Sequence, residues 1–254
     1  MARIDLNSDL GESFGPWPMG DDAAMLQIVT SANVACGGHA SDPDNMFETL
    51  RLARENGVVV GAHPGFADLL GFGRRIIPMK PAEIGRMCVA QIGALVGMGA
   101  LVGHPVRYVK PHGALGNLAA ADMDVARVIV GDVKAAFPEL AFLAISGGAL
   151  DVAAREAGCD TYSEIFADRG YLSNGQLVPR GTEGAMIHDA GEAAARLVEM
   201  LETGLMPVID GDPIPLAAQS ICVHGDSPTA VAMAAEVRDR LRAEGIMVEG
   251  FLAP

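Results

Sequence analysis

Aromatic residues and cysteines are scarce in this sequence. Phe, Trp and Tyr together make up 5% of its 254 residues. The four cysteines form no C-x-x-C pair, so the sequence indicates neither a zinc ribbon nor a disulfide scaffold; they are Cys36, Cys88, Cys159 and Cys222. The chain turns polar at Asp5, so we expect no signal peptide. Reduced thiols and a cytoplasmic location are therefore predicted.

Long apolar runs and an excess of positive charge are also missing. The longest apolar stretch, from Cys88 to Gly103, is interrupted by Gln91 and by glycines, so we expect no membrane span there. Asp and Glu number 32 against 18 Lys and Arg, which gives a formal net charge of −14. Because an acidic surface repels nucleic acid and anionic membranes, neither is a predicted partner.

Two common nucleotide-binding motifs are absent. The sequence has no G-x-x-x-x-G-K-[ST] phosphate-binding loop and no G-x-G-x-x-G dinucleotide fingerprint. The sequence therefore predicts neither ATP binding in the P-loop mode nor a Rossmann cofactor site.

Short apolar runs alternate with amphipathic stretches along the whole chain. Each run is typical of a strand buried on both faces, and strands that alternate with helices form a parallel sheet. The predicted strands are Arg3–Asn7, Ser31–Ala35, Val58–Ala62, Arg107–Lys110, Ala141–Ile145, Thr161–Phe166 and Ser220–Val223. We predict an α/β fold, a single seven-stranded (β/α) barrel domain over residues 1–254, with a doubly wound open sheet as the alternative. Glycines in the segment 167–186 predict a hairpin insertion.

Two helices carry clear end signals. Asp42 and Pro43 predict the start of a helix that ends near Asn56, before Gly57. The last helix is expected to start at Asp226-Ser227-Pro228. Its inner stripe is predicted at helical spacing, at Ala230, Ala234, Val237 and Leu241.

Polar residues recur where the predicted strands end. Barrel enzymes place their catalytic groups at the carboxyl ends of the strands, so these residues predict one site. The segments are Asp5 to Glu12, Asn33 to His39, Gly61 to Gly65, Lys110 to Gly113, Glu164 with Asp168-Arg169, and His224 to Asp226. In a strand, Asp5, Asn7 and Asp9 point to one face, and carboxylates aimed at a barrel axis are costly without a function. The simpler alternative is that they form turns and caps.

The histidines and basic residues of these segments allow several interpretations. Four of the six histidines, His39, His63, His112 and His224, follow strands, although a single such histidine is more often structural. Together with a carboxylate they would suit a divalent metal, or acid–base chemistry without one. Lys110 is either an anion-binding or electrophilic group or a surface lysine. Arg74 and Arg75 either bind an anion or form a solvated pair.

Seven of these motifs, taken in order, strongly resemble the LamB/YcsF family. They are Asp5-Leu6-Asn7-Ser8-Asp9-Leu10-Gly11-Glu12, Ser31 to His39, Gly61-Ala62-His63-Pro64-Gly65-Phe66, Gly71-Phe72-Gly73-Arg74-Arg75, Val109 to Leu115, Glu164 to Arg169, and Cys222 to Pro228. The resemblance implies a seven-stranded TIM-like barrel related to polysaccharide-deacetylase barrels. It also implies one component of an ATP-dependent 5-oxoprolinase, which opens 5-oxo-L-proline to L-glutamate with ATP and Mg²⁺ and works with subunits B and C.

The residues at the strand ends and the resemblance together predict a site. Its catalytic residues are predicted to be Asp9, His39, His63, Lys110 and His112. Residues expected to bind substrate or phosphate are Asn7, Glu12, Arg74, Glu164, Asp168, Arg169, His224 and Asp226. Asp9, His39 and His63 are the candidate ligands if a divalent metal is bound, by analogy with the deacetylase barrels. Two functional alternatives stay open, a metal-dependent deacetylase or amidohydrolase acting alone and a non-catalytic binding subunit.

The sequence departs from the family pattern at one position. The resemblance implies a Tyr after Ala114-Leu115, but Gly116 stands there, before Asn117. A hydroxyl expected near the rim of the barrel is therefore missing, and substrate contact or loop packing is expected to differ at this point.

Overall fold

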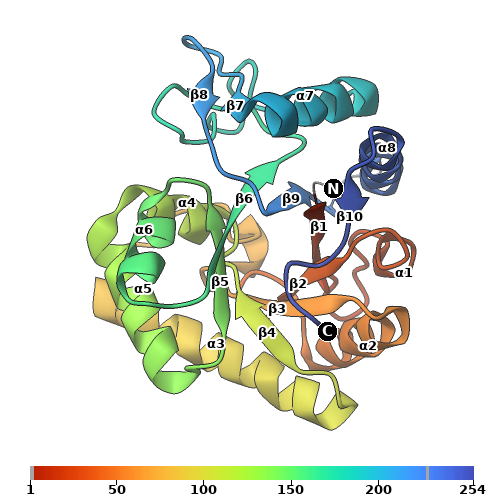
Figure 1. Cartoon of the computed structure of the whole chain (residues 1–254). Helices are drawn as coiled ribbons and strands as arrows, with labels where there is room; N and C mark the ends of the chain where they lie inside the picture. The colour runs from red at the N-terminus through yellow and green to blue at the C-terminus, as the bar shows by residue number, and fades with distance from the viewer. Residues whose placement is uncertain (1–2, 227–228) are drawn as a thin grey trace.

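Seven parallel strands close into a barrel in the computed structural model, which describes residues 3–226 and 229–254 (Figure 1). The strands are β1 (Arg3–Leu10), β2 (Ser31–Ala35), β3 (Val59–His63), β4 (Val106–Val109), β5 (Ala141–Ile145), β6 (Thr161–Phe166) and β9 (Ser220–Val223). Each strand pairs with the next, and β9 pairs with both β6 and β1. The predicted barrel is confirmed, and the open-sheet alternative is wrong because β9 closes the ring.

Helices follow most of the strands and surround the barrel (Figure 1). They are α1 (Asp22–Met25), α2 (Pro43–Asn56), α3 (Pro81–Val102), α4 (Gly113–Ala121), α5 (Met123–Ala136), α6 (Ala149–Glu156), α7 (Ala190–Thr203) and α8 (Ala230–Ala243), with a 3-10 turn at Leu69–Gly71. Three short strands were not predicted from the sequence. β7 (Leu205–Met206) and β8 (Ile214–Pro215) pair antiparallel, and β10 (Met247–Val248) extends the sheet beside the start of β1.

The two predicted helix patterns are confirmed. In α2 the Asp42 side chain accepts hydrogen bonds from the backbone N–H groups of Asp44 and Asn45, and Gly57 ends the helix in the left-handed conformation. In α8 the predicted inner stripe is buried, together with Met233. The predicted start at Ser227 and Pro228 lies outside the described residues.

The apolar stretch before β4 is longer than its sequence indicated. Helix α3 begins at Pro81, has 22 residues and reaches a mean hydropathy of 1.5, so by length and composition it is able to cross a membrane. The length of this stretch therefore does not by itself exclude a membrane span. Ile84, Cys88, Ile92 and Leu95 recur at helical spacing on its buried side. In this fold α3 packs against α2 and α5 as part of the outer layer.

The strands separate an apolar outer layer from a polar interior. Along β1, Leu6 belongs to the apolar core that the helices cover, whereas Asp5, Asn7 and Asp9 alternate with it and bond to side chains across the barrel. This confirms the prediction that Asp5, Asn7 and Asp9 point to the same face of the strand, because side chains alternate between its two faces. The polar side chains inside the barrel lie directly beneath the predicted site.

An aromatic plug closes the barrel at the amino ends of its strands. The Tyr108 ring lies 5.0 Å from that of Phe251, near the end of the chain, and packs with Val59 and Leu143. Gly61 makes room for it, because a Cβ atom there would lie 2.2 Å from the Tyr108 ring. The side chains that line the cavity gather at the opposite end, where the strands finish.

Candidate active site

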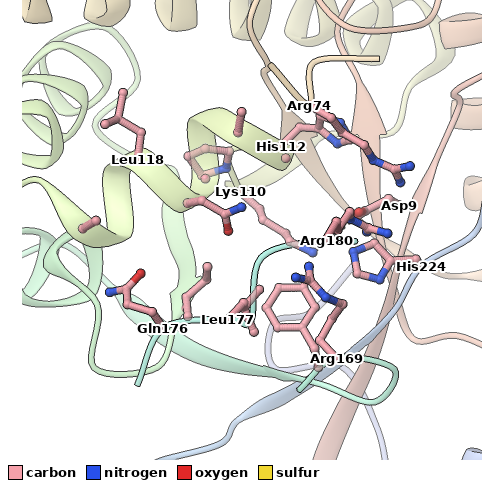
Figure 2. A pocket seen from close by; sticks show the side chains of 18 of the residues that line it. Asp9, Arg74, Lys110, His112, Leu118, Arg169, Gln176, Leu177, Arg180 and His224 are labelled. Atoms are coloured by element: carbon pink, nitrogen blue, oxygen red, sulfur yellow. Dashed lines mark hydrogen bonds and ion pairs between the residues drawn. The ribbon is translucent and has the colours of Figure 1, made fainter. Parts of the chain in front are cut away.

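A cavity of about 500 Å³ opens at the carboxyl ends of the strands (Figure 2). It is lined by residues from β1, β3, β5, β6 and α4 and from the loops that follow β3, β4, β6 and β9. Among them are six of the predicted site residues that follow strands, namely Asp9, His63, Lys110, His112, Glu164 and His224. His39 lies one layer further back, with its ring stacked on that of His112 at 3.6 Å. The structure therefore brings these predicted residues together at one end of the barrel.

Lys110 lies at the centre of the cavity floor, in a ring of acceptors. Its Nζ atom is 3.0 Å from Asp9 Oδ1, 3.1 Å from Glu164 Oε2 and 3.1 Å from Cys222 Sγ. Burial opposes the charged form, but Asp9, followed by Cys222 and Glu164, raises the pKa of Lys110 well above its ordinary value. The side chain is 3% exposed, so Lys110 is a buried cation and not a surface lysine.

Asp9 is the ionised partner in this ring. Burial opposes ionisation, but His63 and Lys110 hold the pKa of Asp9 well below its usual range. Glu164 behaves differently, because burial raises its pKa by more than Lys110 lowers it. The floor of the cavity therefore pairs Lys110 chiefly with Asp9.

A column of hydrogen bonds continues from Lys110 down the barrel axis. Asn33 Nδ2 donates to Asn7 Oδ1 at 2.7 Å and to Asp9 Oδ1 at 2.9 Å. Asn7 Nδ2 donates in turn to Ser220 Oγ at 2.7 Å, and the Ser220 hydroxyl donates to Asp5. Burial raises the pKa of Asp5 to about 6. Asn7 therefore supports Lys110 and Glu164 from below and does not line the cavity.

Three imidazoles and a carboxylate form a compact cluster beside this floor. One donor atom from each of Glu12, His39, His63 and His112 lies within 4.8 Å of all the others. His39 Nε2 is 3.0 Å from Glu12 Oε1, and His63 Nε2 is 3.0 Å from His112 Nδ1. Burial lowers the pKa of His39 and of His112, and raises that of Glu12. Of all the described side chains, these four are the group arranged to hold a metal ion.

His224 and Asp168 form a second acid–base pair on the other side of the cavity. His224 Nδ1 lies 2.8 Å from Asp168 Oδ2, and its ring stacks on that of Phe166 at 5.5 Å. Burial opposes ionisation of Asp168, but His224 lowers the pKa of this carboxyl. The two residues lie in the loops that follow β9 and β6, as predicted from their positions after the strands.

The arginines divide into a cavity group and a structural one. Arg74 lines the cavity and pairs with Asp226 at 2.5 Å, so both predicted residues lie at the rim. Arg75 pairs instead with Asp68 on an exposed loop and does not line the cavity. Arg180, which the sequence reasoning missed, also lines the cavity, near the other two arginines of the site.

Arg169 anchors the segment that follows β6. Its guanidinium donates to the backbone carbonyls of Ala185 at 3.1 Å and Val178 at 2.6 Å, while its side chain also borders the cavity. Antiparallel bridges join Arg169 with Met186 and Tyr171 with Leu177. This segment, expected to be a hairpin insertion, forms one wall of the cavity (Figure 2).

Gly116 lies on α4 in the cavity wall. A Cβ atom at this position would lie 2.6 Å from the backbone oxygen of Pro111. Pro111 belongs to the Lys110-Pro111-His112 segment, so the missing side chain allows α4 and the lysine loop to approach closely. The departure from the family pattern therefore has a packing reason in this chain.

Known proteins resemble this chain over its whole length. It is 50% identical, over 99% of this chain and 98% of the other, to a protein of Agrobacterium fabrum whose name describes it as a 5-oxoprolinase subunit. The crystal structure of a lactam utilization protein from Thermus thermophilus superposes with a TM-score of 0.92 at 41% identity and covers 98% of this chain and 100% of that one. The word subunit in the first name indicates a protein that works in a complex.

More distant structures share the fold. The catalytic domain of a peptidoglycan N-acetylglucosamine deacetylase from Eubacterium rectale superposes with a TM-score of 0.50 at 9% identity, over 99% of this chain and 90% of that one. At this identity the likeness shows the fold alone, and it agrees with the predicted relation to deacetylase barrels. The model of the LamB/YcsF family matches residues 4–253, so the motif resemblance extends over nearly the entire sequence and the chain is a member of the LamB/YcsF family.

Proposed function

We propose that this chain is one of the subunits of an ATP-dependent 5-oxoprolinase and that its cavity opens the lactam ring of 5-oxo-L-proline to give L-glutamate. The observation that carries the proposal is the placing of two proton-transfer groups, Asp9 and the His224–Asp168 pair, around one cavity with the buried cation Lys110 between them. The relatives named as 5-oxoprolinase subunits supply the substrate class. A cytoplasmic location is part of the proposal, because ATP is available there.

The reaction divides into steps that need charge neutralisation and proton transfer. Transfer of the γ-phosphoryl group from ATP to the lactam oxygen gives an imidate phosphate and ADP. Water adds to the ring carbon, the C–N bond breaks, and the ring nitrogen takes up protons and becomes the amino group. A second water then hydrolyses the acyl phosphate to the carboxylate and phosphate. ATP coupling is reasonable because an unstrained lactam is a poor electrophile.

Cationic groups around the cavity suit an anionic substrate and its phosphate. Lys110 points at the cavity from its floor, and Arg74 and Arg180 line its walls. Guanidinium groups bind carboxylate and phosphate with two parallel hydrogen bonds, whereas an ammonium acts as a point charge. We assign the ring carboxylate or the phosphate to the arginines, and the oxygen that gains negative charge to Lys110.

The two acid–base groups suit opposite proton transfers. Asp9 is held ionised by Lys110 and lies 3.4 Å from His63 Nε2, so this side of the cavity can take a proton from attacking water. His224 is oriented by Asp168 and can pass a proton to the departing ring nitrogen. The separation of the two groups across one cavity is what an addition followed by C–N cleavage requires.

The nucleotide and the other subunits complete the proposal. The sequence has no P-loop, so ATP with Mg²⁺ is expected to bind in another mode or on a partner chain. We propose that the partners are subunits B and C, and that the activated substrate reaches this barrel within the complex. The name of the relatives supports an assembly of several subunits without specifying its members.

Reconstitution tests this function directly. The chain is mixed with candidate subunits B and C, and glutamate release from 5-oxo-L-proline is measured with and without ATP. We expect release only when ATP and all three subunits are present. Absence of glutamate from the complete, folded complex would exclude the proposed function.

One alternative has a specific observation in its favour. The cluster of Glu12, His39, His63 and His112 would also suit a metal-dependent amidohydrolase or deacetylase that acts alone. This alternative predicts hydrolysis of N-acetylated sugars or simple amides by the isolated chain without ATP. A non-catalytic binding subunit predicts instead that replacing Asp9 and His39 leaves turnover by the complex unchanged.

A further inference from the structure

Backbone carbonyls fix the orientation of two histidines in the cluster beside the cavity floor. His63 Nδ1 lies 2.6 Å from the carbonyl oxygen of Lys110, and His112 Nε2 lies 2.9 Å from that of Phe72. A carbonyl oxygen only accepts hydrogen bonds, so each of these ring nitrogens carries the proton. In a neutral imidazole the other nitrogen then presents a lone pair.

The two lone pairs point at each other. The nitrogens that remain, His63 Nε2 and His112 Nδ1, are 3.0 Å apart, which is hydrogen-bond distance with no proton to share. Glu12 Oε1 lies 3.6 Å from the same His112 nitrogen and 3.0 Å from His39 Nε2. All four side chains are buried, and the 3.0 Å between His63 Nε2 and His112 Nδ1 leaves no room for a water molecule between them. Acceptor atoms that face one another repel, and a cation bound between them would remove this repulsion.

We propose that Glu12, His39, His63 and His112 bind one divalent transition-metal ion of the zinc type. Three imidazole nitrogens and one carboxylate oxygen form a donor set that zinc accepts and that magnesium, which prefers oxygen, does not favour. Ligands at about 2.0–2.1 Å from a tetrahedral ion lie roughly 3.3 Å from one another. The observed separations of 3.0, 3.0 and 3.6 Å agree with that spacing.

The contacts around two of the four side chains resemble the outer hydrogen bonds of metal sites. Ligating histidines commonly donate their second N–H to a carbonyl or carboxylate, which fixes the ring. The carbonyls of Lys110 and Phe72 do this for His63 and His112. Because one of these carbonyls belongs to the lysine at the cavity floor, the metal site and the anion site share a single loop.

The proposed ligand set differs from the one expected from the sequence in its carboxylate. Asp9 Oδ2 lies 3.4 Å from His63 Nε2, but its Oδ1 atom is occupied by Lys110 and Asn33. Glu12 contacts two of the histidines and no described Lys or Arg within ion-pair distance. Glu12 is therefore the carboxylate left to neutralise a metal ion, and Asp9 is left for Lys110. When bound, such an ion would supply a Lewis acid beside the cavity.

Metal binding to the isolated chain tests the proposal without any turnover assay. The protein is stripped with a chelator and titrated separately with Co²⁺ and Zn²⁺, with binding followed by calorimetry and by the visible absorption of cobalt. We expect one ion per chain, a four-coordinate cobalt spectrum that Zn²⁺ abolishes by displacement, and a higher melting temperature in the bound form.

Matched variants identify the ligands. Glu12→Gln keeps the size of the side chain and should weaken Co²⁺ binding by about 100-fold or more, as should His112→Gln. His104→Gln is the control, because His104 is also buried and bonded to a carbonyl, that of Val58, but lies at the amino ends of the strands. It should bind Co²⁺ like the unaltered chain. Melting temperatures measured without metal confirm that each variant is folded.

Two results would overturn the inference. One is the absence of Co²⁺ and Zn²⁺ binding at micromolar concentrations by the folded, unaltered chain. The other is equal Co²⁺ affinity in Glu12→Gln, His112→Gln and the unaltered chain, which would place the ion elsewhere. Neither result bears on 5-oxo-L-proline hydrolysis, which is judged separately by reconstitution.

Discussion

His224 Nδ1 donates to both carboxylate oxygens of Asp168, at 2.9 and 2.8 Å, so one side chain fixes both the tautomer and the tilt of the other. This arrangement directs the Nε2 edge of the ring away from Asp168. In Asp168→Asn the amide is free to turn its own donor toward the ring and to favour the wrong tautomer. We expect kcat of the reconstituted complex to fall by about 100-fold or more, with little change in KM.

An exposed carboxylate provides the control for that variant. Asp239 pairs with Arg238 on the outer surface of α8. Asp239→Asn should leave both kinetic constants unchanged, because the loss of a surface ion pair has little energetic effect. Equal kcat values for the two variants would show that the His224–Asp168 pair plays no part in proton transfer.

Replacing either Asp9 or His39 tests whether this barrel is the hydrolytic centre. We expect Asp9→Ala and His39→Ala each to reduce glutamate formation by about 100-fold or more, because the first removes a positioned base and the second breaks the histidine cluster beside it. Circular dichroism must show that both variants fold, and co-purification must show that they still enter the complex. Normal turnover by both would favour a protein that binds substrate without acting on it.

Lys110→Met tests the charge balance of the cavity floor. Removing the ammonium leaves the Asp9 carboxylate buried without its cation, and breaking a buried pair in this way typically costs about 3–5 kcal/mol. We expect a lower free energy of unfolding in urea, and partial recovery when Asp9→Asn is added to Lys110→Met. An additive double variant would mean that the two charges do not interact.

Asp5 should make stability depend on pH. Its pKa is raised to about 6 in the folded chain, chiefly by burial and in part by Glu164, against 3.8 for an ordinary aspartate. The folded state therefore holds this proton more tightly than the unfolded state, and stability is lost as the pH rises through that range. Relative to Asp5→Asn, the unaltered chain should lose about 2 kcal/mol between about pH 4 and about pH 7.

Urea unfolding of both chains across this pH range measures the difference. Other carboxyl groups titrate in the same interval, and comparison with Asp5→Asn removes their contribution. A difference in unfolding free energy that is flat with pH would show that Asp5 is ionised in the folded protein.

Gly116→Ala tests the close contact between α4 and the lysine loop. A methyl group at this position meets the Pro111 oxygen, so we expect a loss of about 1–3 kcal/mol and a lower melting temperature. Gly131 lies inside α5 with open space around its Cβ position. Gly131→Ala should therefore stabilise the protein by about 0.5–1 kcal/mol. Equal effects of the two substitutions would mean that the loop moves away at no cost.

Strand limits were predicted correctly where the apolar run in the sequence has the same limits as the strand. The limits of β2, β5, β6 and β9 agree with the sequence prediction. Strand β1 continues to Leu10, three residues beyond its predicted end at Asn7, because its polar side chains enter the interior of the barrel. A polar residue signals the end of a strand only when the interior is apolar. The strands β7, β8 and β10 have only two residues each, which is too few to show the alternation of apolar and polar residues that identifies a strand in a sequence.

The site was predictable as far as strand ends determine it. Strand alternation placed Asp9, Lys110 and Glu164 on one floor. It did not place Glu12 beside His39 and His112, because that contact depends on how three loops fold over the barrel rim. Nor did it separate Arg74 from Arg75, or bring Arg180 from a distant segment into the cavity wall.

The seam between β1 and β9 has a consequence for how the protein is made. Asp5 stands opposite Ser220 in this pairing, so the ring closes between segments far apart in the gene product. A nascent chain on the ribosome can pair its first six barrel strands in order, but both edges of that arc stay open until the seventh emerges. The polar column also lacks its Ser220 link until then. The floor beneath the cavity is therefore completed only late in synthesis, and chains released before that point would expose two unpaired strand edges.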